Sequence, residues 1–404
     1  MEFSIIIRNY NYGRFLSDCV DSALSQTSDL VEVIVVDDGS TDDSRQILKR
    51  YGDRVTVIEK TNGGECSAAN AGLDAAKGDW VIFLDSDDVL APNCVETVAQ
   101  AVTKDCTRVH WHVALIDDGG ALTGYILPPK PYPDLSFVES MKLYGAALSA
   151  CQSSNAYRRD ALIKAFPADT SMWKRSIDVL MNGCALAQGR TANLKTVLAG
   201  YRIHPCNLSE QNTREVASTK HSVLVHKNLE TCLREFLGPQ VSTMSFGYPR
   251  YHWYHRLASF RLAPESHPFP NDRRSILFLR TLRASSGPNR DTWFMRVVIF
   301  GGTVVLAYLP RPVLRALFPL FARVSRRLSL SRSGRAALSN LSPELRKGLH
   351  WRDAFDILSG VSGSSGTPER SFGDGTPSKE SNVGATSSTL PFPRTSDVKP
   401  GAET

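Results

Sequence analysis

Three aspartates stand close together just after an apolar run. Asp85, Asp87 and Asp88 directly follow the apolar residues 80–84. Two unit charges about 4 Å apart interact by about 4 kcal/mol at an effective dielectric of about 20, so the cluster is costly unless a cation lies between the carboxylates or they bind protons. A hard divalent ion, Mg²⁺ or Mn²⁺, suits aspartates at positions i and i+2 and often binds substrate phosphates as well. The cluster predicts a metal site, with a solvated turn before a helix as the alternative.

A second acidic pair ends another apolar run. Asp37 and Asp38 follow the apolar stretch 31–36 and precede Gly39-Ser40. Aspartate and glycine are common turn residues, which is one reading of this pattern. The other is a carboxylate held at the edge of a sheet, where it could accept a hydrogen bond from a nucleobase N–H.

Both acidic clusters fall where predicted strands end. Short apolar, β-branched runs begin near residues 3, 31, 55 and 80, and each is followed by a helix-length segment. This alternation predicts an α/β fold with a mainly parallel sheet and helices on both faces. Ligands bind at the carboxyl ends of the strands in such sheets. Three polar clusters, at residues 8–11, 37–38 and 85–88, should therefore meet at one edge. Ser40 is expected to cap the helix that follows it.

The rest of the chain has weaker patterns. We expect strands around 109–116 and 194–202, a helix around 177–187, and helix from about 215 to 260. From about 360 the chain is rich in Ser, Gly, Thr and Pro, which is typical of disorder. These patterns divide the chain into a first domain with two halves, a helical basic region and a disordered tail, at residues 1–210 (1–103 and 104–210), 211–355 and 356–404.

Charge is unevenly distributed along the chain. The formal net charge of +6 is made of −6 over residues 1–249, +15 over 250–352 and −3 over 353–404. A basic block of this size suggests contact with nucleic acid, a membrane surface or another polyanion. The hydrophobic content of 42% and charged content of 22% exclude a wholly disordered chain, a collagen-like fibre and a polytopic membrane protein.

An apolar segment lies inside the basic block. Residues 297–309 are apolar or small, and this run of 13 is shorter than the roughly 20 residues needed to span a bilayer. Pro310-Arg311-Pro312 interrupts it, a second apolar stretch continues to residue 320, and several arginines follow. Two readings of 297–320 stay open: a segment lying in a membrane interface, and a buried core helix with a solvated basic flank.

The cysteines and the N-terminus bear on location. The 8 cysteines are scattered with no Cys-x-x-Cys pair, so a zinc knuckle is not expected. An apolar strand begins at Phe3, so no signal peptide is expected. We expect a cytoplasmic protein, and the basic block adds a position at the inner face of the plasma membrane.

Five motifs in order resemble those of family 2 glycosyltransferases. The resemblance is close over about residues 3–100 and loose over 150–210. It is carried by the segments 4–11 (SIIIRNYN), 22–27 (SALSQT), 33–42 (VIVVDDGSTD), 69–72 (ANAG) and 78–88 (GDWVIFLDSDD).

This resemblance implies an inverting transferase with the nucleotide-diphospho-sugar transferase fold (GT-A type), whose first half binds the nucleotide sugar and whose second half binds the acceptor. Asp38 matches the family carboxylate that contacts the base, and Tyr10 matches the aromatic residue near the ring. Asp87 matches the carboxylate that coordinates the metal on the diphosphate, with Asp85 nearby towards the ribose. Arg8 departs from the usual family pattern, which puts uridine specificity in doubt, and it could reach a phosphate.

Direct displacement also requires a carboxylate that takes the proton of the acceptor hydroxyl. Asp178, at the start of the predicted helix 177–187, matches the family position of this base; an aspartate at a helix start is also favoured by the helix dipole alone. His204 is a candidate donor or ligand near the diphosphate, although a lone histidine is more often a core or surface residue. Asp88 is a further candidate beside the metal.

The resemblance therefore implies an enzyme that uses Mn²⁺ or Mg²⁺ to move a sugar from a nucleoside-diphosphate donor to a hydroxyl of a glycan or glycolipid, in cell-surface polysaccharide or glycolipid synthesis. The alternative is a catalytically degenerate transferase-fold protein that binds a membrane or polyanion through residues 250–352. Nucleic acid is not an expected partner, because no recognised nucleic-acid motif accompanies the arginines. A peripheral contact with an anionic membrane fits the neighbouring apolar run better.

Overall fold

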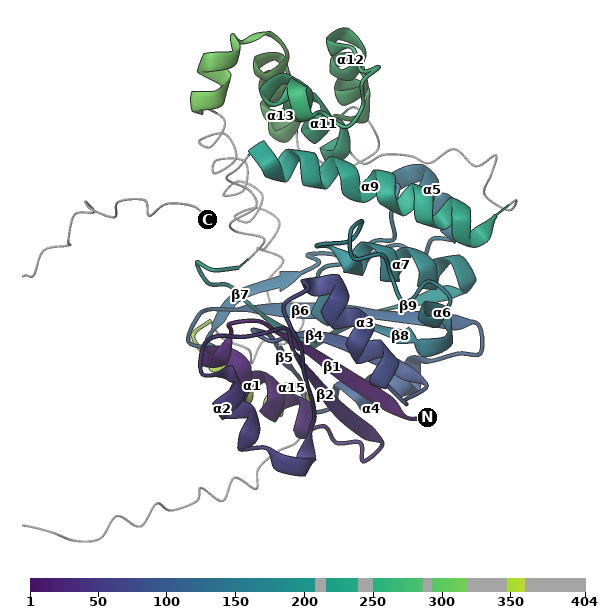
Figure 1. Ribbon diagram of the computed structural model, residues 1–404, viewed down its shortest axis with the longest axis vertical. Helices are drawn as coiled ribbons and strands as arrows, with labels where there is room; N and C mark the ends of the chain where they lie inside the picture. The colour runs from purple at the N-terminus through teal and green to yellow at the C-terminus, as the bar shows by residue number, and fades with distance from the viewer. Residues whose placement is uncertain (208–215, 239–249, 286–292, 318–346, 360–404) are drawn as a thin grey trace, which may run out of the picture. The chain divides into compact units, whose positions relative to one another are not determined.

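The computed structural model describes residues 1–207, 216–238, 250–285, 293–317 and 347–359 (Figure 1). The predicted tail from about 360 lies outside the described residues, and so do residues 318–320 of the apolar segment.

The first hundred residues alternate strand and helix as predicted. The strands at residues 3, 31, 55 and 80 are confirmed, with bounds within a residue or two of the expected ones. The elements in chain order are β1 (Phe3–Asn9), α1 (Gly13–Leu24), β2 (Val31–Asp37), α2 (Ser44–Lys49), β3 (Thr56–Glu59), α3 (Glu65–Ala75), β4 (Trp80–Asp85), β5 (Val89–Leu90) and α4 (Cys94–Ala101).

The following hundred residues complete one sheet. Strands near 109–116 and 194–202 and a helix near 177–187 are confirmed as β6, β9 and α7. The elements are β6 (Cys106–Ile116), β7 (Leu122–Leu127), α5 (Phe137–Tyr144), β8 (Asn155–Arg158), α6 (Arg159–Ile163), α7 (Ile177–Gln188) and β9 (Arg190–Arg202).

The sheet is mixed. Its strand order is β3-β2-β1-β4-β8-β6-β9-β5, with β7 paired to β6. The first four strands are parallel to one another, as expected from the strand–helix alternation. In the second half only β6 and β9 are parallel, whereas β8, β7 and β5 pair antiparallel with their neighbours. The predicted α/β class is confirmed, and the mainly parallel arrangement holds for the half of the sheet made of β1 to β4.

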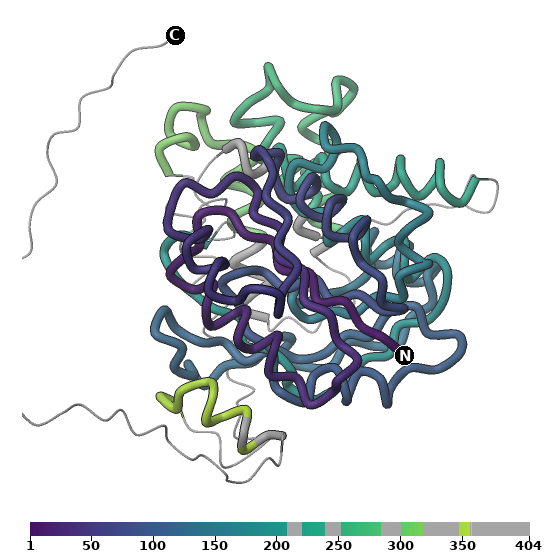
Figure 2. The backbone as a smooth tube through the Cα atoms, turned by 60° about the horizontal axis from the view of Figure 1, so that its bottom comes forward, coloured from purple at the N-terminus to yellow at the C-terminus, as the bar shows by residue number. Residues whose placement is uncertain are grey.

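The register brings the predicted polar clusters together. Asn9 at the end of β1 lies opposite Asp37 at the end of β2, and Arg8 lies opposite Asp85 at the end of β4. The three strand ends therefore meet at one edge, as the spacing predicted. In Figure 2 the purple tube of β1 lies among the neighbouring strands.

Alternate side chains of β1 enter separate cores. Ile5 and Ile7 join a buried cluster with α1 and α2, whereas Ile6 joins another with α3 and α7. This alternation is the strand period of two applied to a sheet covered on both faces. The sheet edge is thus fixed by packing on both sides.

One local prediction is wrong. Ser40 does not cap the next helix, because α2 begins at Ser44 after Asp43. The Ser40 hydroxyl instead accepts hydrogen bonds from the Asn11 backbone N–H at 2.9 Å and the Asn9 amide at 3.1 Å. It therefore joins the end of β1 to the turn after β2.

Helices make up the described part of the basic region. They are α9 (Val216–Leu237), α11 (Arg250–Leu262), α12 (Arg274–Ser285), α13 (Trp293–Tyr308) and α15 (Trp351–Ser359). Helix α9 packs its Leu229 against α7 so closely that a Cβ on Gly183 would lie 2.8 Å from the leucine. Helix α15 crosses the boundary expected between residues 355 and 356.

The apolar segment 297–320 falls largely within α13 and the helical residues that follow it. Leu306 and Ala307 are buried in a cluster that includes Leu257 and Leu277 of α11 and α12. Within the described ranges, no helix is both long enough and apolar enough to cross a bilayer.

Candidate active site

The two aspartates after β2 have different structural roles. Asp37 is fully buried, and its Oδ1 accepts hydrogen bonds from the backbone N–H groups of Gly39 and Ser40 at 3.1 and 2.7 Å. Its Oδ2 accepts from the Asn9 amide at 3.2 Å. Asp37 therefore builds the turn.

Asp38 ties this turn to the start of α3. Its oxygens accept from the backbone N–H groups of Gly63 and Gly64, the shortest at 2.7 Å, and from the Lys60 ammonium at 2.6 Å. These are four hydrogen bonds, about the number that a carboxylate accepts, and they hold Asp38 in a fixed position. Tyr10, the predicted aromatic partner of the ring, has 46% of its surface exposed at the same edge.

Arg8 neutralises the first aspartate of the cluster after β4. Its Nη2 lies 2.5 Å from Asp85 Oδ1, and its side chain is only 9% exposed. The other two guanidinium nitrogens are buried and have no hydrogen-bond partner among the described residues. Burial raises the pKa of Asp85, and Arg8 opposes that rise. The residue that departs from the family pattern is thus a counter-ion inside the site.

Glu65 and Asp178 form another acidic pair close enough to Arg8 to raise its pKa. Asp178 is in the first turn of α7, and burial followed by the charge of Glu65 raises its pKa to about 6. Burial also raises the pKa of Glu65, whereas Arg8 lowers the pKa of both. Glu65 Oε2 accepts from the backbone N–H of Ser176 at 3.0 Å, and Ser176 has the left-handed backbone φ of 61°. Glu65 therefore fixes the turn that presents Asp178.

Asp87 and His204 come together although they are far apart in sequence. His204 Nε2 lies 3.0 Å from Asp87 Oδ2, and the Asn207 amide donates to the same oxygen at 3.3 Å. His204 Nδ1 accepts from the Cys206 backbone N–H at 3.2 Å, which puts the ring proton on Nε2 and makes it a donor to Asp87. His204 therefore orients the Asp87 carboxylate.

Asp88 anchors the turn from within. It is 1% exposed, and its oxygens accept from the Ser153 hydroxyl at 2.6 Å and the Arg202 backbone N–H at 2.9 Å. Burial and the nearby Asp87 raise the pKa of Asp88 well above its usual range. The Arg202 guanidinium in turn donates through Nε to the Asp87 carbonyl at 2.8 Å. Asp88 and Arg202 hold Asp87 in place.

The donor set at Asp87 fits a hard divalent cation. The contacts from His204 and Asn207 both reach Oδ2 of Asp87, so its other oxygen could bind Mg²⁺ or Mn²⁺, which are commonly held by one or two carboxylates together with substrate phosphates. The described residues contain no group of three or more His, Cys, Asp or Glu side chains that could hold a metal without such oxygens. Asp85 is engaged by Arg8, so Asp87 is the better placed of the two predicted metal ligands.

All predicted site residues lie around this edge, and the structure adds others. Glu65, Arg202 and Asn207 were not singled out as site residues from the sequence. Asn207 and Arg202 flank His204, so a wider window around that histidine would have included them. Glu65 follows Gly63-Gly64 at the start of α3 and offers no distinguishing local signal.

A family model describes the residues that build this edge. The model named "Glycosyl transferase family 2" matches residues 4–166, which contain β1 to β4 and the acidic clusters. Residues 4–166 therefore form a glycosyl transferase family 2 domain. This confirms the resemblance inferred from the five motifs.

Two curated family members show how far the likeness extends. An uncharacterized glycosyltransferase from Nostoc sp. is 37% identical over 218 residues, which are 51% of this chain and 66% of that protein. Glycosyltransferase GlyG from Streptococcus pneumoniae is 41% identical over 103 residues, 24% of this chain and 34% of that protein. The chain thus spans less than two thirds of the length of these two relatives.

Among solved structures, S. aureus TarS (residues 1–349, in complex with UDP-GlcNAc) aligns over 81% of this chain and 92% of that one. The identity is 17% and the TM-score is 0.46, so this likeness carries no argument about activity.

The raised pKa of Asp178 predicts a pH-dependent cost to stability. An unfolded aspartate has a pKa of about 3.9, so a folded value near 6 means that the unfolded state loses its proton first as the pH rises. The cost grows from about pH 4 to 6 and is constant above. Asp178→Asn should therefore increase the free energy of unfolding at pH 8 by up to about 3 kcal/mol, less near pH 4. Urea unfolding at both pH values measures this.

The matched control is Asp74→Asn, an exposed aspartate of α3. It should change stability little and equally at both pH values. An equal effect of Asp178→Asn at pH 4 and pH 8 would contradict the raised pKa.

Proposed function

We propose that this protein is an inverting, metal-dependent glycosyltransferase that moves a sugar from a nucleoside-diphosphate donor to a hydroxyl of a glycan or glycolipid. The observation that carries the proposal is the meeting of Asp38, Asp87 and Asp178 around one sheet edge, each held by contacts of its own. The family match supports glycosyl transfer as the reaction class. The side chains suggest which residues bind the nucleotide, hold the metal and accept the proton.

The nucleotide side of the site is formed by Tyr10 and Asp38. The half-exposed Tyr10 ring offers a face on which a base can stack. Asp38 is already bound by two backbone N–H groups and Lys60, so its position is fixed before a donor arrives. Such preorganisation reduces the ordering cost of binding.

The diphosphate side is formed by Asp87. This carboxylate would hold Mn²⁺ or Mg²⁺, and His204 and Asn207 would keep it oriented. When bound, the metal supplies positive charge that stabilises the leaving diphosphate. Arg8 adds a fixed cation beside Asp85, which limits the repulsion between the cluster and an anionic donor.

The acceptor side is formed by Asp178. A carboxylate with a pKa of about 6 is largely ionised at neutral pH and is still basic enough to accept the proton of an acceptor hydroxyl. Glu65 orients it indirectly, because it fixes the backbone of Ser176 two residues before. Inversion follows if Asp178 and the leaving diphosphate lie on opposite sides of the sugar.

The described helices of the basic region support a second proposal, a peripheral contact with the anionic inner face of the plasma membrane. Helices α12 and α13 and the residues after them expose large apolar side chains, and exposed arginines lie on these elements or directly before α12. The apolar side chains are Ile276, Leu279, Phe300, Tyr308 and Val313, and the arginines are Arg273, Arg274, Arg280, Arg283 and Arg311. Apolar side chains flanked by arginines suit the interface of an anionic bilayer.

Removing the Asp87 carboxylate should abolish transfer without unfolding the protein. Asp87→Ala should reduce turnover of nucleotide sugars by a factor of about 10²–10³ or more, because charge on the leaving diphosphate is then no longer stabilised. The measurement is release of nucleoside diphosphate from a panel of nucleotide sugars with Mn²⁺, which also identifies the donor. Asp74→Ala is the control. Full activity of Asp87→Ala with the metal chelated would contradict the proposal, and an inactive parent would favour the degenerate binding protein.

Two neighbours of Asp178 should move the pH profile in opposite directions. In the parent, kcat/KM should rise with pH through about 6 as Asp178 loses its proton. Glu65→Gln removes a negative charge that raises this pKa, so the rise should move to lower pH. Arg8→Met removes a positive charge that lowers it, so the rise should move to higher pH. A shift of both variants in one direction would exclude Asp178 as the titrating base.

The full-length protein should bind anionic vesicles in a salt-sensitive manner. Co-flotation with phosphatidylglycerol vesicles should fall as NaCl increases, and phosphatidylcholine vesicles and duplex DNA should bind weakly. The double variant Leu279→Glu/Phe300→Glu should weaken flotation. Val138→Glu, which changes an exposed apolar residue on α5, should not. Binding to DNA but not to vesicles would contradict the membrane proposal.

A further inference from the structure

The C-terminal residues 347–357 return to the sheet of the catalytic domain. The Gly348 N–H donates to the Leu122 carbonyl and the Leu122 N–H donates to the Leu349 carbonyl, both at 2.8 Å. His350 forms an antiparallel bridge with Ala121. Through these bonds, residues 348–350 pair with the start of β7. They lie far beyond residue 166, where the family match ends.

Helix α15 then packs against the strand that follows the acidic turn. Its Trp351 and Phe355 are buried in one cluster with Val89 and Ala91, which come directly after Asp88. A Cβ on Gly120 would lie 2.8 Å from the Trp351 ring, and Gly120 has a φ of +86°. The glycine therefore permits the close approach of this tryptophan.

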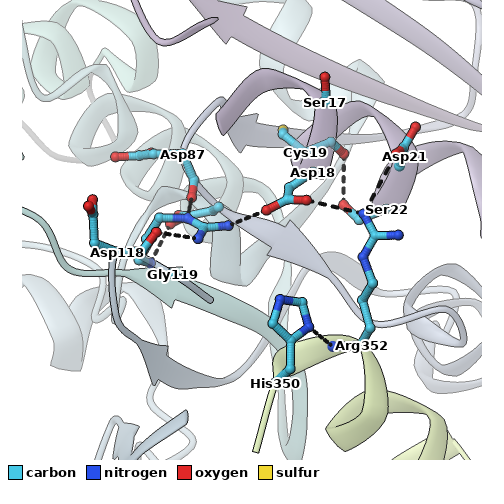
Figure 3. A network of polar contacts seen from close by, with 12 residues as sticks. Ser17, Asp18, Cys19, Asp21, Ser22, Asp87, Asp118, Gly119, His350 and Arg352 are labelled. Carbon is cyan, nitrogen blue, oxygen red and sulfur yellow. Dashed lines mark hydrogen bonds and ion pairs between the residues drawn. The ribbon is translucent and has the colours of Figure 1, made fainter. Parts of the chain in front are cut away.

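An ionic chain connects the same helix to Asp87. Arg352 Nη2 lies 3.1 Å from Asp18 Oδ1 and 3.6 Å from Asp21 Oδ2. The second Asp18 oxygen lies 3.1 Å from Nη2 of Arg202. Figure 3 shows the Asp18 carboxylate with Arg352 on one side, while Asp87, Asp118 and Gly119 lie on the other.

Arg202 is the buried link of this chain. Its side chain is 1% exposed, and it donates to the carbonyls of Asp87 and Asp118 at 2.8 and 3.1 Å as well as to Asp18. A guanidinium with its donors directed at three fixed acceptors has little freedom to turn. Arg202 therefore links the Asp18 carboxylate to the backbone of Asp87.

We propose that residues 347–357 are part of the donor site, and that Arg352 and Asp18 are positioning residues that hold the Asp87–Asp88 turn through Arg202. This inference rests on the proposed function, in which Asp87 binds the metal and the donor diphosphate. The apolar contacts fix the strand after the turn, and the ionic chain fixes the turn itself.

The test compares full-length Arg352→Gln, Arg352→Lys and Asp18→Asn with the parent in two measurements. Hydrogen exchange without ligand should be about two- to fivefold faster at residues 88–91 in Arg352→Gln, the range for a partly exposed ion pair, and near the parent value in Arg352→Lys. Calorimetry with UDP, GDP, CDP and ADP, each with Mn²⁺, should give a similarly weakened Kd for the nucleotide that the parent binds. In the double variant Asp18→Asn/Arg352→Gln, the exchange rate and the Kd should differ little from those of either single variant, because both substitutions break the same ionic chain.

Asp353→Asn, an exposed neighbour on the same helix, is the control and should leave both measurements unchanged. Unchanged exchange at residues 88–91 in Arg352→Gln would overturn the inference, even if the Tm falls, because the helix would then contribute stability alone. If the parent binds none of the four nucleotides with Mn²⁺, the proposed function fails. The exchange measurement still decides whether Arg352 holds the turn.

Discussion

The site depends on how a sheet edge tolerates several carboxylates close together. Parallel register alone brings the ends of β1, β2 and β4 to one place and with them Asp37 and Asp85. Without compensation this arrangement would favour unfolding or protonation. The protein compensates locally. Arg8 forms an ion pair with Asp85, and Lys60 forms one with Asp38. In the turn after β4, Arg202 donates hydrogen bonds through its backbone N–H to Asp88 and through its guanidinium to the Asp87 carbonyl.

The compensating contacts differ from one aspartate to the next, so the aspartates can have different roles. The carboxylate oxygens of Asp37 and Asp88 accept hydrogen bonds from other groups of the protein, so these two residues fix the backbone. Asp87 keeps one oxygen with no protein contact among the described residues, and Asp178 has a pKa in the range of a general base. Identical side chains thus differ according to what surrounds them: some anchor the backbone, and the proposed function uses the others as a metal ligand and a base.

The sequence was sufficient for those features that follow from local periodicity. Alternation of strand and helix predicted that Arg8, Asp38 and Asp85 share one edge, because parallel strands align their carboxyl ends. The contact between Asp87 and His204 spans 117 residues, and no local pattern specifies it. The return of Trp351 and Arg352 to the sheet was not predicted for the same reason. Ser40 was misassigned as a helix cap because its competing partners, Asn9 and Asn11, come from another strand.

The docking of α15 has a consequence for how the protein is made. A ribosome adds about 5–20 residues per second, so the segment between Arg202 and Arg352 takes on the order of ten seconds to synthesise. During that time the strands β1 to β9 can already pair, while the apolar surface that later receives Trp351 and Phe355 is still uncovered. The nascent chain therefore exposes this surface to chaperones or to other nascent chains until residues 351–355 have been synthesised and have folded back.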